Sequence, residues 1–77
     1  MPSVSLSDIE SVSRSELKDS RLKALENGYA PFDKVLNSSS DPIALEKNSR
    51  PYKISDGRHR VYLARQKGYS SVNVRFV

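Results

Sequence analysis

The chain has 77 residues, 36% of them hydrophobic, with no tryptophan and a formal net charge of +4. This length predicts one domain, 1–77, whose core is thin and whose stability is marginal. The lack of cysteine excludes disulfides, thiolate metal sites and cysteine chemistry. The longest apolar run, Val61–Ala64, is too short to cross a membrane, and residues 1–8 do not resemble a secretory signal. We therefore expect a cytoplasmic protein with no membrane partner.

Charge is distributed unequally between the two halves of the chain. Residues 1–46 contain five Lys or Arg and eight Asp or Glu, whereas residues 47–77 contain eight and one. A strongly basic C-terminal half suggests an anionic partner there. The alternative is that these cations only keep a small domain in solution.

The N-terminal third predicts a strand followed by a helix. Residues 3–9 alternate apolar side chains with serines, the pattern of a short strand. A capping box that begins at Ser13 predicts a helix from there to Asn27. Gly28 is expected to end this helix in the left-handed conformation, with Tyr29 covering its end.

The middle of the chain carries fewer signals. Pro31 prevents the first helix from continuing, and Phe32, Val35 and Leu36 form a small apolar group. We expect these three to pack at the margin of the core. Residues 37–42 are a polar loop rich in turn-forming residues.

The C-terminal half predicts three strands and a second helix. Residues 43–46 and 52–55 read as strands of a hairpin, and the helix is expected over 58–67 with Gly68 as its end. The last strand follows at 72–76, where apolar and polar residues alternate.

The order strand, helix, strand, strand, helix, strand indicates an α+β fold, a small mixed β-sheet with two packing helices. In the second helix Val61 and Ala64 share one face, which we expect to pack on the sheet.

The D-G-R-H-R sequence at 56–60 is the densest chemical feature of the chain. It lies at the predicted start of the second helix, where free backbone N–H groups and the helix dipole attract phosphate. Gly57 allows a ligand close to the backbone, Arg58 and Arg60 offer forked donors, and His59 adds a polar contact. Asp56 caps the helix or faces a metal or a ribose hydroxyl. The simpler interpretation is an ordinary capped helix with solvent-facing cations.

Residues 52–69, followed by the V-N-V of 72–74, resemble the signature of the ParB/sulfiredoxin superfamily. In that signature a strand leads into a D-G-x-H-R or G-x-R-R turn, a helix with an alanine, a glycine and a last strand. The P-I-A-L of 42–45 is similar to the P-I-x-V strand of the family, with Leu45 in place of valine. The resemblance covers 42–77 and is weak before that.

The resemblance implies binding of a nucleotide or another phosphate-bearing ligand by Gly57, Arg58, His59 and Arg60. Members of the family include partition proteins, small-molecule kinases, nucleases and sulfinic-acid reductases. Sulfiredoxins have a cysteine where this chain has Arg58, so sulfinic-acid reduction is excluded. The chain is also too short for the DNA-reading and dimerisation domains of full partition proteins, which leaves an expected ligand-binding core.

Three functions remain open from the sequence. The first is a domain that binds a nucleotide or nucleic-acid phosphate at the 57–60 turn. The second is a nuclease or phosphotransferase at the same place, with Asp56 and His59 as the candidate catalytic residues. The third is a degenerate relative that binds another protein. With one histidine the chain offers no histidine-rich metal site, and the metal left open by the sequence is Mg²⁺ bound with a nucleotide.

Overall fold

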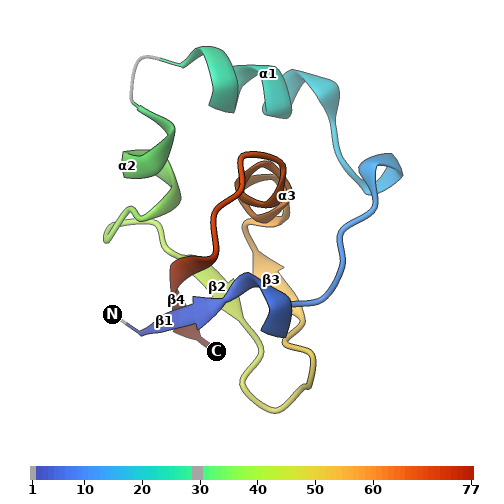
Figure 1. Ribbon diagram of the computed structural model, residues 1–77, viewed down its shortest axis with the longest axis vertical. Helices are drawn as coiled ribbons and strands as arrows, with labels where there is room; N and C mark the ends of the chain where they lie inside the picture. Colours follow the sequence, from blue (N-terminus) through green and yellow to red (C-terminus); the bar gives the residue numbers. More distant parts are fainter. Residues whose placement is uncertain (1, 29–30) are drawn as a thin grey trace.

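The computed structural model describes residues 2–28 and 31–77, which form a four-stranded mixed sheet and three α-helices (Figure 1). The sheet order is β1-β4-β2-β3. The strands are β1 (Ser3–Ser5), β2 (Ile43–Leu45), β3 (Ile54–Asp56) and β4 (Ser71–Phe76), and the helices are α1 (Asp19–Asn27), α2 (Phe32–Leu36) and α3 (Arg58–Gln66).

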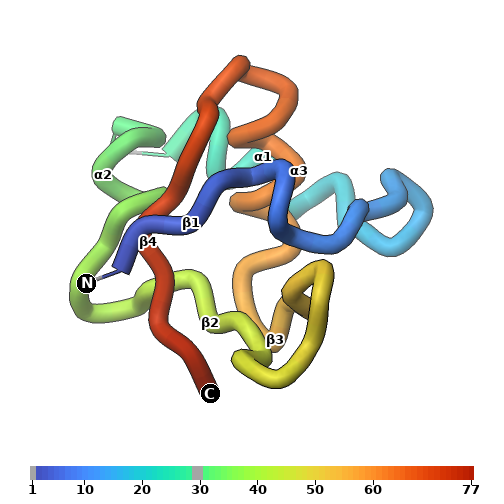
Figure 2. Tube along the Cα trace, turned by 60° about the horizontal axis from the view of Figure 1, so that its bottom comes forward, coloured from blue at the N-terminus to red at the C-terminus, as the bar shows by residue number. Residues whose placement is uncertain are grey.

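Strand β4 is central to the sheet. It pairs antiparallel with β1, as Figure 2 shows, and parallel with β2, which in turn pairs antiparallel with β3. The antiparallel β2–β3 pair confirms the predicted hairpin. The α+β class and the mixed sheet are confirmed as well.

Helix α3 lies between the sheet and α1 (Figure 1). Val61 and Ala64 are fully buried in the main core cluster, which confirms the helix face expected from their spacing. Leu63, on another side of α3, is also buried, and so is Leu22 of α1. Helix α3 is therefore covered on more than one side.

The structure adds a helix to the two that were expected. Residues Phe32–Leu36 form α2, in which Val35 N–H bonds to the Pro31 carbonyl at 3.2 Å. Leu36 is fully buried, while Phe32 packs on the margin of the core as expected. Within the described residues, no helix has the length and apolar character needed to span a bilayer.

The predicted strand at 3–9 is wrong in its length. Strand β1 ends at Ser5, and residues 6–8 make a 3-10 turn. The turn brings Ile9 beside Tyr52 in an isolated parallel bridge, where Glu10 N–H bonds to the Tyr52 carbonyl at 2.9 Å. The chain thereby covers the outer edge of the residues that lead into β3.

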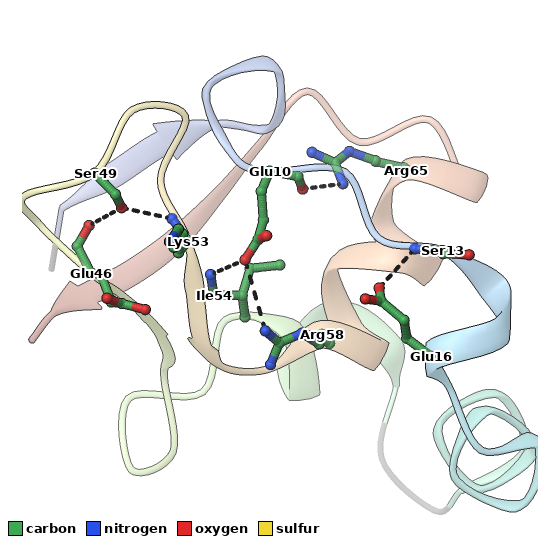
Figure 3. Close-up of polar contacts among 9 residues, drawn as sticks. All are labelled: Glu10, Ser13, Glu16, Glu46, Ser49, Lys53, Ile54, Arg58 and Arg65. Carbon is green, nitrogen blue, oxygen red and sulfur yellow. Dashed lines mark hydrogen bonds and ion pairs between the residues drawn. The ribbon is translucent and has the colours of Figure 1, made fainter.

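The predicted start of the first helix is also wrong. Ser13 begins only a 3-10 turn, in which the Glu16 carboxylate accepts the Ser13 N–H at 3.0 Å (Figure 3). Residue 17 is extended, and α1 begins at Asp19. A capping box satisfies local donors in either kind of turn, so it does not by itself extend a helix.

Gly28 does not take the expected left-handed conformation, since its φ is −72°. A Cβ at this position would lie 2.7 Å from the Ala24 carbonyl oxygen, so the glycine is needed for space. The expected role of Tyr29 lies outside the described residues.

The predicted boundaries in the C-terminal half need small corrections. Strand β3 begins at Ile54, because Tyr52 is engaged by the 8–10 segment, and α3 ends one residue early, at Gln66. Gly68 follows with a φ of 83°, consistent with its predicted role as helix end.

Candidate functional site

A pocket of about 570 Å³ lies between the N-terminus of α3 and the helices α1 and α2. Its volume is in the range of pockets that bind small molecules. Four parts of the chain line it: Arg21, Ala24 and Leu25 of α1, Lys34 and Val35 of α2, Ser38 and Asp41 of the next loop, and Asp56, Gly57, His59 and Arg60 at the start of α3.

The start of α3 offers backbone donors. Val61 N–H is the first amide of α3 to bond within the helix, to the Gly57 carbonyl at 3.0 Å. The amides of Arg58, His59 and Arg60 precede it and have no acceptor among the described residues, as is usual for the first turn of a helix. Among the described residues no side chain caps this end, where Gly57 is the N-cap, so the expected cap by Asp56 is not formed. These N–H groups and the helix dipole make the end attractive to an anion.

Gly57 is required here for two reasons. Its φ of 106° lies in the left-handed region, which residues with a Cβ rarely adopt. A Cβ would also lie 2.9 Å from Ile43 Cγ1 of β2. The glycine therefore allows close packing of the turn on the sheet, in addition to the ligand approach that the sequence suggested.

Arg60 is placed in the pocket wall with its side chain only 8% exposed. Its guanidinium donates to the carbonyl oxygens of Asp41 at 2.6 Å and of Val35 at 3.5 Å. It also lies 3.9 Å from the carboxylate of Asp56. Arg60 thus joins α3 to the segment after α2, and its substitution tests folding at the same time as ligand binding.

Arg58 is separated from the other predicted site residues. It is absent from the pocket lining, and its guanidinium lies 3.9 Å from a carboxylate oxygen of Glu10 (Figure 3). The same oxygen of Glu10 accepts the Ile54 N–H at 2.6 Å. The side chain of Arg58 therefore points toward the N-terminal segment.

His59 connects α3 to the start of α1. Its Nε2 accepts the Lys18 N–H at 3.1 Å, so this nitrogen carries no proton and the imidazole is neutral. Partial burial, followed by the positive charges of Arg21 and Lys18, lowers the pKa of His59. In this state Nε2 is not free to accept a proton from a substrate.

This contact predicts a pH dependence of stability. The folded protein binds the His59 proton less readily than the unfolded chain does, because the pKa of His59 is lowered on folding. The contribution of the Lys18–His59 bond to the free energy of unfolding is therefore complete above about pH 6.5, the pKa of an unperturbed histidine. It is lost as the pH falls through the lowered pKa.

Urea unfolding of the wild type and His59→Gln between about pH 5 and 8 measures this effect, since glutamine offers an oxygen acceptor that does not titrate in this range. We expect the wild type to lose more stability than the variant at the acidic end. Parallel curves for the two proteins would show that His59 is not the titrating group.

Arg21 and Lys34 are the cations of the pocket that were not predicted from the sequence. Arg21 is on the exposed surface of α1, and Lys34 is on α2, a helix that was not predicted. In the sequence both are ordinary surface cations. Only the packing of α1 and α2 beside α3 brings them to the pocket.

The carboxylates do not form an evident catalytic group. Asp56 and Asp41 line the pocket, and both face the guanidinium of Arg60 at 3.9 and 4.0 Å. Within the described residues, no group of three or more His, Asp or Glu side chains could hold a metal ion. A Mg²⁺ ion at this site would need ligands from a bound phosphate.

No family model, curated protein or solved structure matches this chain. The resemblance to the ParB/sulfiredoxin superfamily stays a prediction that rests on the residues of the motif.

Proposed function

We propose that this domain binds a small phosphate-bearing ligand, of which a nucleotide is the leading class, in the pocket at the start of α3. One observation carries the proposal. His59 and Arg60 at the start of α3, whose amides have no acceptor among the described residues, line the same pocket as Arg21 of α1 and Lys34 of α2. Donors of this kind from three helices suit the several oxygens of a phosphate.

The other walls of the pocket support a ligand larger than inorganic phosphate. Ala24, Leu25 and Val35 contribute apolar surface, which can pack against a ring. Asp41 and Asp56 are acceptors for hydroxyl or amino groups. The combination is suited to a molecule with an anionic end and a neutral polar body.

The same geometry favours binding over catalysis. Among the predicted catalytic residues, His59 uses Nε2 to bind Lys18 N–H, and Asp56 lies beside Arg60. A nuclease or phosphotransferase would need His59 to release that bond or Asp56 to act without a second carboxylate.

A degenerate protein-binding domain stays the third alternative. A cytoplasmic location and Mg²⁺ carried by the nucleotide remain parts of the proposal.

The test is an NMR titration of the ¹⁵N-labelled protein with ATP, CTP and inorganic phosphate, with and without Mg²⁺. We expect the amides of residues 57–60 to shift. The double variant Arg21→Gln/Lys34→Gln should weaken nucleotide binding about a hundredfold or more, because each of the two lost charge-assisted bonds is worth about 1.5–3 kcal/mol.

Lys23→Gln/Arg75→Gln is the matched control, because it also removes one lysine and one arginine. Both residues are exposed and neither lines the pocket, so this variant should bind as the wild type does. Lys67 is a poorer control, because its Nζ lies 5.2 Å from the centre of the Phe32 ring. Equal loss in the control variant, or no shifts at 57–60, would contradict the proposal. Turnover of the nucleotide would favour the enzyme.

A further inference from the structure

The loop between β2 and β3, residues 46–53, forms a second basic feature of the molecule. Figure 1 shows it projecting at the end of the molecule opposite α1, and Figure 2 shows it extending beyond the sheet. It contains no residue that lines the pocket at α3. Any function of this loop is therefore separate from the ligand site proposed above.

Internal hydrogen bonds order this loop. The Ser49 hydroxyl donates to the Glu46 carbonyl and accepts the Lys53 N–H, both at 2.9 Å (Figure 3). At the end of the loop, Tyr52 N–H bonds to the Asp8 carbonyl at 2.9 Å. These bonds pre-organise the loop, which lowers the entropic cost of binding.

The charges of the loop are largely uncompensated. Lys47, Arg50 and Lys53 are exposed, and within the described residues none of them is in an ion pair. Glu46 is the one acid of the segment. Arg75 of β4, in register with Ala44 of the neighbouring β2, adds a further exposed cation near this end of the sheet.

The surroundings of the loop argue against an apolar partner. Val77 is the single large hydrophobic residue that is exposed in the described part of the chain, at 48%. The Tyr52 ring is already in contact with the Arg50 guanidinium, 4.7 Å from its centre, and with Phe76, at 5.1 Å. Neither a buried protein interface nor insertion into a bilayer has the apolar surface it requires.

We propose that the 46–53 loop contacts the phosphate backbone of a nucleic acid, without selecting its sequence. Several cations on an ordered loop match the regular charges of a polynucleotide chain. Because the Tyr52 ring is already in contact with the Arg50 guanidinium and the Phe76 ring, it is not a free platform on which to stack a base. Contacts with phosphate alone carry no sequence information.

Fluorescence anisotropy with labelled single-stranded DNA, RNA and duplex DNA of mixed sequence tests this proposal. In Lys47→Gln/Lys53→Gln we expect roughly tenfold weaker binding at about 100 mM salt. The plot of log K against log salt should become less steep, its negative slope shrinking in magnitude by about 1.4–1.8. Each of the two lost phosphate contacts contributes about 0.7–0.9 to that magnitude. Oligonucleotides of different sequence should bind alike.

Lys18→Gln/Lys23→Gln is the control, because it removes the same charge and residue type from exposed positions at α1. This variant should retain the affinity and slope of the wild type. Equal losses in the two variants, no binding of any nucleic acid, or a preference for anionic vesicles or acidic peptides would overturn the proposal. The NMR titration with ATP should be unchanged in Lys47→Gln/Lys53→Gln, so failure here is distinguishable from failure of the pocket.

Discussion

Replacing Ala64 with aspartate is expected to lower the free energy of unfolding by roughly 3–5 kcal/mol. Ala64 is fully buried in the apolar core cluster between α3 and the sheet, where a carboxylate is removed from water. Burial of a charge without a partner is among the most destabilising single changes. In a domain of this size such a loss removes most of the stability. Urea unfolding followed by circular dichroism measures it.

Gln66→Asp is the control for this prediction. Gln66 is exposed on the same helix, so the same new charge should cost less than about 1 kcal/mol there. Similar unfolding curves for the two variants would show that α3 does not pack on the sheet through Ala64.

Replacing Arg65 with methionine is expected to cost roughly 3–4 kcal/mol of stability. The guanidinium of Arg65 donates to three backbone carbonyls of the N-terminal segment, those of Leu6 at 2.8 Å, Ile9 at 2.7 Å and Glu10 at 3.0 Å. Methionine keeps much of the aliphatic packing but leaves these acceptors without their donor. Figure 3 shows the bond to Glu10. Denaturant unfolding and hydrogen exchange of residues 6–10 measure the loss.

Two further variants make the Arg65 prediction specific. Arg75→Met, at an exposed position of β4, should change stability by less than about 0.5 kcal/mol. Arg65→Lys keeps the charge but loses the planar fork of donors. Its free energy of unfolding should therefore lie between those of Arg65→Met and the wild type. Wild-type stability in Arg65→Lys would mean that charge alone, and not three directed bonds, matters here.

Long-range contacts of Arg65 and His59 also explain why two expectations from the sequence failed. Arg65 binds the carbonyls of the 6–10 segment, which turns the chain away from β1 after Ser5. His59 accepts the Lys18 N–H, and this bond fixes the start of α1 just after Lys18. The capping box at Ser13 is formed as well, but it does not start the α-helix. In each case a side chain far away in sequence binds a backbone group that local patterns treat as free.

The candidate site was predicted in part. Asp56, Gly57, His59 and Arg60 do line one pocket, whereas Arg58 does not. The turn chemistry of D-G and the basic first helical turn are visible in sequence because they involve adjacent residues. The burial of Arg60 is not, since it depends on the carbonyls of Val35 and Asp41.

The sequence by itself determined the α+β class, the β2–β3 hairpin and the course of α3 from Arg58 into β4. These elements follow from signals within a few residues, namely apolar periodicity, a glycine at each end of α3 and turn-forming residues between strands. Only the tertiary structure decided the length of β1, the start of α1 and the assembly of the pocket. Arg21, Lys34 and the start of α3 meet there because α1 and α2 fold beside α3. The backbone and side-chain partners that set these features lie far apart in the chain, so no local pattern can specify them.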